Sequence, residues 1–265
     1  MNIEQKIGLV LSGGGYKGIA HAGVLQFLDE QNIRPNYIAG TSAGSIVSSL
    51  YAAGIKPQEI LTFFKSVNLF NWQHFTLKKA GLIDVNTFDK YLNKVFGDKT
   101  IGELNIPVYI NATNIVTGEQ QIFKKKTRIV DAVLASSAFP GVFSPYQIGD
   151  KIYSDGGILN NFPIDVIKKK CDLIIGVNVN PLQQVQAENF TSIRAVTVRA
   201  YELMTTMQNA KGGQLCDWLI EPKELTLYST FERSRKKMDE IYELGYNTAK
   251  ESFKEKQDIF KKATP

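Results

Sequence analysis

Short apolar runs alternate with stretches of helical periodicity along most of the chain. Residues 7–11 form an apolar run that ends in glycines, and residues 36–39 and 172–179 form two further short runs. Runs of this length bounded by turn residues predict buried strands. Between the first two runs a helix is predicted over residues 17–30, where apolar side chains recur at helical spacing at Ile19, Val24, Phe27 and Leu28.

Turn residues and periodicity predict the other elements. Helices are expected at residues 45–53, 57–66 and 129–137, each bounded by a glycine or a proline. Two strands are expected within residues 106–124, and a hairpin at 147–154. The last third is mainly helical, and its apolar stripe predicts core packing by Met238, Ile241, Tyr242, Gly245, Tyr246, Ala249 and Phe253.

The alternation of strands and helices predicts the fold class. Such a chain forms a largely parallel sheet that is covered by helices on both faces. We therefore expect an α/β protein with three α/β/α layers and a mostly parallel central sheet. The sequence has no internal repeat, low-complexity segment or linker, so residues 1–265 are predicted to form a single domain.

Composition places the chain among ordinary globular proteins, with 43% hydrophobic and 22% charged residues. Two cysteines, Cys171 and Cys216, provide neither a disulfide framework nor a metal spacing, and two histidines make a zinc site unexpected. We expect neither a metal nor a cofactor. The N-terminus lacks the pattern of a secretory signal, and no apolar run approaches the ~18 residues of a membrane span. These features predict a cytoplasmic protein.

The net charge of +5 is modest, and lysines and arginines cluster at residues 124–126, 168–170, 235–237 and 261–262. Most of these clusters are interpreted as solvated helix ends and loops, although such clusters also suit anionic lipid headgroups. The chain has no motif that combines aromatic and basic residues for binding nucleic acid, so nucleic acid is not an expected partner.

A glycine-rich segment, SGGGYKG at residues 12–18, follows the first predicted strand and opens a helix. Gly13, Gly15 and Gly18 match the spacing of a dinucleotide fingerprint, but residues 31–48 lack the acidic residue that would hold a ribose. Ile19 also stands where a phosphate-binding loop would have its lysine. The segment better suits backbone N–H groups that bind an anion, including a reaction oxyanion. The alternative is a tight turn that binds nothing.

The segment GTSAG, residues 40–44, also lies between a predicted strand and a predicted helix. Ser42 stands between Gly40 and Gly44, which is the spacing and context of a nucleophile elbow. In that arrangement the N–H of Ala43 and the helix N-terminus face developing negative charge. The alternative is a serine in a flexible loop of small residues.

A nucleophilic serine needs a base, and the sequence limits the choice. No histidine follows His74, so the chain order Ser…Asp…His is excluded. His21 is better interpreted as a packed or capping residue, and His74 as a surface or lid residue. Asp155, in YSDGG, follows a predicted strand and precedes Gly156 and Gly157, which predicts a Ser–Asp dyad. An aspartate that merely caps a loop is the alternative.

Together these motifs resemble the patatin-like phospholipase family, most closely its short bacterial members. The likeness includes HAGVLQFL, GLID, SSAFPGVFSP and NNFP, and covers nearly the whole chain. The resemblance implies hydrolysis of lipid acyl esters without a metal, with Ser42 as nucleophile and Asp155 as base. It implies an oxyanion hole made by the N–H groups of Gly13, Gly14 and Gly15. Supporting positions would be Lys17, Gly40, Ala43, Gly44, Gly156 and Gly157.

Three questions stay open from the sequence. Lys17 is predicted either to orient the glycine loop or meet a phosphate, or to be a surface lysine. Residues 63–83 are rich in aromatic and basic residues, which fits either a lid that contacts lipid or a helix with a packed loop. The third question is the type of reaction, because an acyltransferase would use the same acyl-serine as a hydrolase. The expected partner is a lipid acyl ester with peripheral membrane contact, and no oligomeric state is predicted.

Overall fold

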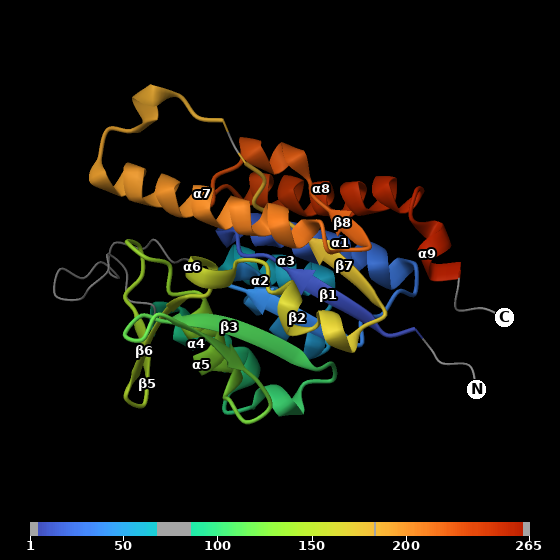
Figure 1. Ribbon diagram of the computed structural model, residues 1–265, viewed down its shortest axis with the longest axis horizontal. Helices are drawn as coiled ribbons and strands as arrows, with labels where there is room; N and C mark the ends of the chain where they lie inside the picture. The colour runs from blue at the N-terminus through green and yellow to red at the C-terminus, as the bar shows by residue number, and fades with distance from the viewer. Residues whose placement is uncertain (1–4, 68–85, 183, 262–265) are drawn as a thin grey trace.

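The computed structural model describes residues 5–67, 86–182 and 184–261, which form a single sheet with helices on both faces (Figure 1). Within these residues the sheet has eight strands, in the order β5-β6-β3-β2-β1-β7-β8, with β4 paired to β3. The strands are β1 (Ile7–Leu11), β2 (Tyr37–Thr41), β3 (Val108–Asn114), β4 (Glu119–Phe123), β5 (Tyr146–Ile148), β6 (Lys151–Asp155), β7 (Leu173–Val177) and β8 (Trp218–Ile220).

The centre of the sheet is parallel and one edge is antiparallel. Strands β1, β2, β3, β7 and β8 run parallel to their neighbours in this centre, whereas β4 and β6 pair antiparallel with β3. The prediction of a mostly parallel sheet is confirmed. The three-residue strand β8 was not predicted, because so short a segment has no recognisable periodicity.

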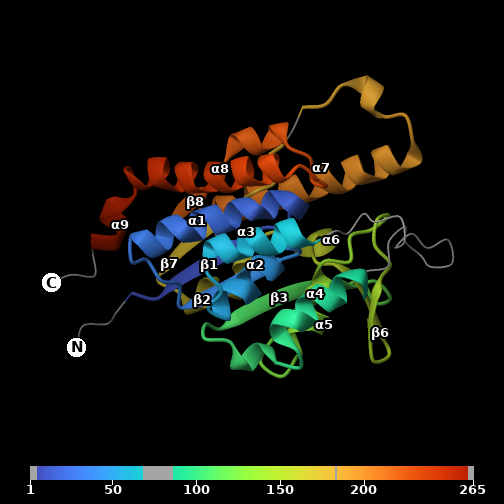
Figure 2. The same ribbon diagram turned by 180° about the vertical axis from the view of Figure 1, so that it is seen from behind.

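Helices cover both faces of the sheet, as Figures 1 and 2 show from opposite sides. One face carries α1 (Ile19–Glu30), α2 (Ala43–Ala52), α3 (Pro57–Ser66), α4 (Asn86–Phe96), α5 (Ile129–Ser136) and α8 (Arg235–Phe253). The other carries α6 (Gly157–Asn160) and α7 (Ile193–Gly213), while α9 (Gln257–Lys261) ends the described chain. None of the helices in the described ranges combines the length and apolar content that crossing a membrane requires.

Alternate side chains of β1 pack into two hydrophobic cores, one on each face of the sheet. Leu9 and Leu11 point into the larger core beneath α1 and α8, and Val10 points into a smaller core on the opposite face. The predicted stripe in α8 is buried at Met238, Ile241, Tyr242, Gly245 and Ala249. The helix predicted from residue 17 begins instead as a 3₁₀ turn, Gly15–Gly18, followed by α1.

The register along β3 places two strand ends side by side. Strand β2 pairs with β3 as far as Thr41 opposite Asn111, and β6 pairs with it from Asp155 opposite Ala112. Strand β4 pairs with the same residues of β3 and must therefore occupy its other edge. Hence β2 and β6 share one edge of β3, and their ends lie at consecutive residues of that strand.

Helices α1 and α8 approach so closely that glycine is required where they cross. A Cβ on Gly245 would lie 2.0 Å from the carbonyl oxygen of Ala20, and one on Gly23 would lie 2.0 Å from that of Tyr242. Both obstacles are backbone atoms, which cannot rotate away. The missing side chains therefore set the distance between the two helices.

We expect Gly245→Ala to destabilise the protein by about 1–3 kcal/mol, because the new methyl group must push the helices apart. The measurement is the midpoint of thermal or urea unfolding. Asn247→Ala, at an exposed position of α8, is the matched control and should be neutral or slightly stabilising, since alanine favours helix. Equal stability of Gly245→Ala and the control would contradict the close crossing.

Candidate active site

Ser42 lies on a strained turn between β2 and α2. Its backbone has φ 52° and ψ −121°, a conformation that costs a residue with a side chain about 1–3 kcal/mol. The turn also brings backbone segments together, since a Cβ on Gly44 would lie 2.2 Å from the carbonyl oxygen of Leu11. This geometry agrees with the predicted elbow and not with a flexible loop.

Neighbouring groups hold the turn in place. The N–H of Ser42 donates to Oγ of Ser136 at 2.8 Å, and the carbonyl oxygen of Ser42 accepts from the N–H groups of Ser45 and Ile46. The side chain of Ser42 is only partly buried, and it projects at the N-terminus of α2, where the helix dipole favours negative charge.

Asp155, the last residue of β6, is completely buried. Its Oδ1 accepts hydrogen bonds from the N–H of Gly157 at 2.8 Å and from the hydroxyl of Tyr201 at 2.9 Å. Its Oδ2 accepts none among the residues that the structure describes, while the Ser42 side chain lies close enough to lower the pKa of the carboxyl group. One oxygen is therefore fixed, and the other can accept a proton.

Burial raises the pKa of Asp155 from its ordinary value of 3.8 to about 6, although hydrogen bonds from Gly157, Ser42 and Tyr201 oppose the shift. The contact from Tyr201 depends on Gly157, since a Cβ there would lie 2.2 Å from the Tyr201 hydroxyl. The predicted aspartate therefore has a pKa suited to exchanging protons near neutral pH.

The glycine loop is tied to several distant segments. Ser12 donates its N–H to Val177 and accepts from the N–H of Val179 with its hydroxyl, and the N–H of Tyr16 donates to the carbonyl oxygen of Thr230 at 2.9 Å. The N–H of Gly13 donates to the carbonyl oxygen of Asn161. The loop is therefore rigidly attached on both sides of its glycines.

The three glycines differ in whether their N–H groups are available. That of Gly13 is occupied by Asn161, at 3.2 Å. In the described part of the chain, Gly14 and Gly15 donate their N–H groups to no other protein group. A ligand in the adjoining pocket would thus meet two available donors, one fewer than the sequence suggested.

His21 is a packed residue, as predicted. It is fully buried, and its Nε2 lies 2.8 Å from the carbonyl oxygen of Ser12, which can accept a hydrogen bond only from a protonated nitrogen. Burial lowers the pKa of His21 to about 4, so the ring is neutral at physiological pH. Through this hydrogen bond the His21 ring holds Ser12, the first residue of the glycine-rich segment.

The prediction that Lys17 could be a surface lysine is wrong, because its side chain is only 3% exposed. Burial lowers the pKa of its ammonium group, and Glu202 on α7 opposes that effect. The alternative in which Lys17 orients the loop stays a prediction.

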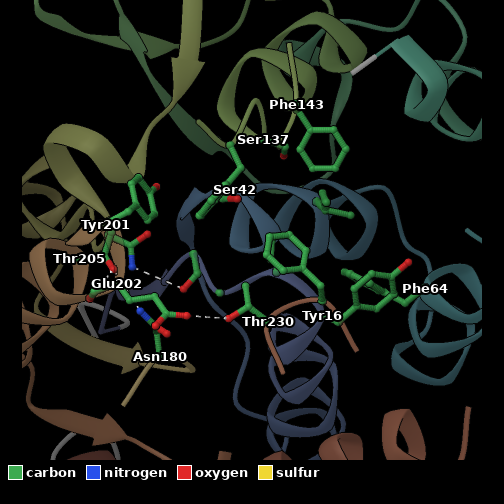
Figure 3. Close-up of a pocket in the computed structure, with 18 of the residues that line it drawn as sticks. Tyr16, Ser42, Phe64, Ser137, Phe143, Asn180, Tyr201, Glu202, Thr205 and Thr230 are labelled. Carbon is green, nitrogen blue, oxygen red and sulfur yellow. Dashed lines mark hydrogen bonds between the residues drawn. The ribbon is translucent and has the colours of Figure 1, made fainter. Parts of the chain in front are cut away.

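A pocket of about 920 Å³, including the open space at its mouth, is lined by Ser42 and by the glycines of the loop. Figure 3 shows Ser42 between an apolar side with Tyr16, Phe64 and Phe143 and a more polar side with Tyr201, Glu202, Thr205 and Asn180. The lining also includes Gly13, Gly14, Gly15, Ala43, Ile46, Val67, Phe88, Ser137, Phe139, Asn161, Thr230 and Phe231. The site can hold a ligand with an apolar and a polar end.

Several residues of the site were not predicted from the sequence. Tyr201 lies in a helix with no motif around it, and its contact with Asp155 depends on tertiary packing. Asn111 on β3 accepts from Thr41 and donates to the carbonyl oxygens of Gly156 and Asn160, so it joins the two loops of the site. Asn161 and Ser136 lie in the segments NNFP and SSAFPGVFSP, which had no assigned role.

The proposed lid at residues 63–83 lies mostly outside the described residues, as do His74 and GLID. Its first part belongs to α3, where Phe63 packs against Phe64, Phe64 lines the pocket and Lys65 pairs with Asp239. Because residues 68–85 lie outside the described part, the choice between a lid and a packed loop stays a prediction.

Known proteins resemble this chain in sequence and in fold. The sequence model of the patatin-like phospholipase family matches residues 9–168. The chain is 34% identical over 187 residues to lysophospholipase NTE1 of Saccharomyces cerevisiae, covering 66% of this chain and 11% of that protein. An uncharacterized NTE family protein of Mycobacterium bovis is 31% identical over 181 residues, covering 67% of this chain and 50% of that protein. The chain thus spans half or less of both relatives.

A solved structure shares the fold. The crystal structure of VipD from Legionella pneumophila superposes with a TM-score of 0.61 at 16% sequence identity. The superposition covers 95% of this chain and 67% of that one. At this level of identity the likeness concerns the arrangement of the sheet and helices.

The buried carboxylate predicts a pH-dependent effect on stability. Burial favours the protonated form of Asp155 in the folded protein. The contribution of this group to the free energy of unfolding is therefore fully present below its ordinary pKa of 3.8 and is lost as the pH rises through about 6. We expect Asp155→Asn to raise the free energy of unfolding by up to roughly 3 kcal/mol above pH 7, since each pKa unit corresponds to about 1.4 kcal/mol.

The measurement is urea unfolding across the pH range. Below about pH 4 the variant and the parent protein should converge, because both carry a neutral group there. Asp150→Asn removes an exposed carboxylate from the same hairpin and should leave the stability within about 0.5 kcal/mol at every pH. If Asp155→Asn were less stable than the parent at alkaline pH, the hydrogen bonds accepted by the Asp155 carboxylate would stabilise the fold by more than the burial of its charge costs.

Proposed function

The chain belongs to the patatin-like phospholipase family, and on that premise we propose that it hydrolyses lipid acyl esters through a dyad of Ser42 and Asp155. The observation that carries the proposal is the arrangement of the Asp155 carboxylate. Gly157 and Tyr201 occupy Oδ1, and Oδ2 is left without a partner among the described residues, beside the Ser42 side chain. A serine hydroxyl paired with a buried base is the arrangement that nucleophilic catalysis needs.

In the proposed first half-reaction, Oγ of Ser42 attacks the carbonyl carbon of the ester while Asp155 accepts the hydroxyl proton. The N–H groups of Gly14 and Gly15 stabilise the oxyanion, and each such donor contributes about 100- to 1000-fold to the rate. The tetrahedral intermediate then expels the alcohol, which takes the proton from Asp155. The acyl group remains on Ser42 as an ester.

In the second half-reaction, Asp155 takes a proton from water as the water oxygen attacks the acyl-serine carbonyl. The same two N–H groups stabilise the second oxyanion. Collapse of this intermediate releases the fatty acid and returns the proton to Ser42. Each half-reaction therefore uses Asp155 first as a base and then as an acid, which suits a pKa of about 6.

The two sides of the pocket support a lipid substrate. We place the acyl chain against the apolar side, among Tyr16, Phe64 and Phe143, and the alcohol portion toward Asn180 and Thr205. The yeast relative is named a lysophospholipase, which supports a lipid acyl ester as the substrate class. Lys17 would orient the loop that carries the oxyanion donors.

We expect a fluorophosphonate probe to label Ser42, because the probe reacts with activated serines. Ser42→Ala should lose the label completely, and Asp155→Asn should reduce labelling by about 1000-fold or more, since the base is gone. Ser137→Ala, which removes another serine hydroxyl from the same pocket, should still be labelled. Mass spectrometry of the labelled peptide is the measurement. Label on folded Ser42→Ala would disprove the assignment.

We expect Tyr201→Phe to shift the acidic limb of the pH profile of kcat/KM upward by about one pH unit. Loss of the donated hydrogen bond disfavours the Asp155 carboxylate and raises its pKa above about 6. The variant should approach the parent rate at alkaline pH, where Asp155 is ionised in both proteins.

The control for this experiment is Tyr146→Phe, which removes a similar Tyr–Asp hydrogen bond, to Asp131, away from the pocket. Its pH profile should match that of the parent. If Tyr201→Phe lowers the rate equally at every pH, Tyr201 contributes packing and does not tune the carboxylate.

A further inference from the structure

A chain of buried amide side chains runs from the glycine loop into the body of the protein. Nδ2 of Asn161 donates to Oδ1 of Asn209 at 3.0 Å, and Nδ2 of Asn209 donates to Oδ1 of Asn178 at 2.7 Å. Nδ2 of Asn178 in turn donates to the partly buried carboxylate of Glu221 at 2.5 Å. Each of the three asparagines is no more than 2% exposed. Apolar side chains of similar shape would cost little stability here, so the choice of amides needs a separate explanation.

At one end of the chain, Asn161 holds Gly13 through two hydrogen bonds. The carbonyl oxygen of Asn161 accepts from the N–H of Gly13 at 3.2 Å, and its Nδ2 donates to the carbonyl oxygen of Gly13 at 3.4 Å. A Cβ on Gly13 would lie 2.3 Å from Oδ1 of Asn161 and 3.2 Å from Cβ of Ser42. Gly13 therefore packs directly against both residues, and the position of Asn161 determines how closely the loop approaches Ser42.

The other end of the chain holds the preceding residue of the loop. Ser12 donates its N–H to the carbonyl oxygen of Val177, and its hydroxyl accepts from the N–H of Val179. Asn178 stands between these two partners in the sequence, and its side chain is bonded to Asn209. Asn209 therefore connects the attachments of two consecutive loop residues.

One turn of α7 supplies further hydrogen bonds to the same two segments. Oε1 of Gln208 accepts from the N–H of Asn161 at 2.7 Å, and its Nε2 donates to the carbonyl oxygen of Ile158 at 3.1 Å. Asn180 donates to the hydroxyl of Thr205 at 3.1 Å, on the polar side of the pocket in Figure 3. This turn thus joins the segment after β6 to the segment after β7.

We propose that Asn178 and Asn209 are positioning residues that hold the glycine loop at its working distance from the nucleophile. The inference rests on the proposed function, which assigns the loop to the reaction oxyanion. Neither asparagine is among the described residues that line the pocket, so both act through Asn161. The donors that they place are the N–H groups of Gly14 and Gly15, which directly follow the residue that Asn161 holds.

The choice of amides follows from this role. Donors stabilise an oxyanion only when they are already aimed at the position where the charge develops. A fully paired chain of buried amides fixes one geometry, because any other arrangement leaves a buried polar group without a partner. Apolar side chains would fill the same space but would not fix the loop to this accuracy.

The test replaces Asn209 by leucine in the full chain, which removes both of its side-chain hydrogen bonds. Each former partner keeps another one, since Asn161 still donates to Gly13 and Asn178 still accepts from the N–H of Asn180. With a soluble short-chain ester we expect kcat to fall by about 10- to 100-fold and KM to change by less than about threefold, because the displaced donors act mainly in the transition state.

A second measurement separates positioning from general damage to the fold. Oγ of Ser42 adds to the carbonyl carbon of an alkyl trifluoromethyl ketone as its proton passes to Asp155, and the former carbonyl oxygen becomes an oxyanion. The Kd of this ketone should rise by about 10- to 100-fold in Asn209→Leu, in parallel with the loss in kcat. The Kd of the corresponding alkyl alcohol, which forms no oxyanion, should stay unchanged.

The matched control is Ser252→Ala, which removes the hydroxyl that accepts from the indole N–H of buried Trp218 at 3.1 Å. Ser252 lies outside the lining of the pocket, and this variant should keep the parental kcat. Hydrogen–deuterium exchange over residues 12–18 reports on the loop without requiring activity. Exchange there should become faster in Asn209→Leu and should stay at the parental rate in Ser252→Ala.

The outcomes decide between a positioning role and a merely structural one. Parental kcat and loop exchange in folded Asn209→Leu would overturn the proposal, and so would equal weakening of the ketone and the alcohol. If Asn209→Leu does not fold, Asn209→Ala removes the same hydrogen bonds without added bulk and is judged by the same measurements. A parent protein that neither hydrolyses esters nor takes a fluorophosphonate label would reject the proposed function, whereas unchanged loop exchange in the variant would reject the role of Asn209 independently.

Discussion

The site depends first on the hydrogen-bond register along β3. Strands β2 and β6 share one edge of β3 and end at consecutive residues of it, opposite Asn111 and Ala112. This register brings the turn after β2 to the end of β6, so Ser42 and Asp155 meet although they are 113 positions apart in sequence. A slip of one residue would turn the side chain of Asp155 to the other face of the sheet. Asn111 stabilises the junction, because it accepts a hydrogen bond from Thr41 before the Ser42 turn and donates to the carbonyl oxygens of Gly156 and Asn160.

A second constraint is the burial of a carboxylate. The sheet and α7 remove Asp155 from water, and this desolvation raises its pKa to about 6. Hydrogen bonds from Gly157 and Tyr201 oppose the shift and keep the charged form accessible near neutral pH. Stability and proposed reactivity therefore oppose each other at this residue, as is common where a fold holds a reactive group.

Motifs that depend on local backbone geometry could be predicted from the sequence. Contacts that arise only when distant segments pack together could not. Small residues around Ser42 and glycines after Asp155 predicted turns, periodic apolar residues predicted α1 and α8, and Pro57 predicted the start of α3. Tyr201 carries no such signal, because its role arises from the approach of α7 to α6. The availability of an N–H group is likewise a property of the folded chain, and only the structure distinguishes Gly13 from Gly14 and Gly15. The burial of Lys17 is equally unpredictable from its neighbours in the sequence.

The attachments of the glycine loop also bear on how the protein is made. The loop lies within the first 18 residues, yet its hydrogen-bond partners include Asn161, Val177, Val179 and Thr230. Synthesis proceeds from the N-terminus, so a nascent chain contains Ser42 and even Asp155 long before the last anchor of the loop has emerged from the ribosome. The full set of anchors therefore exists only once Thr230 has been synthesised, and a fragment cut before Thr230 lacks the hydrogen bond that Tyr16 donates to it.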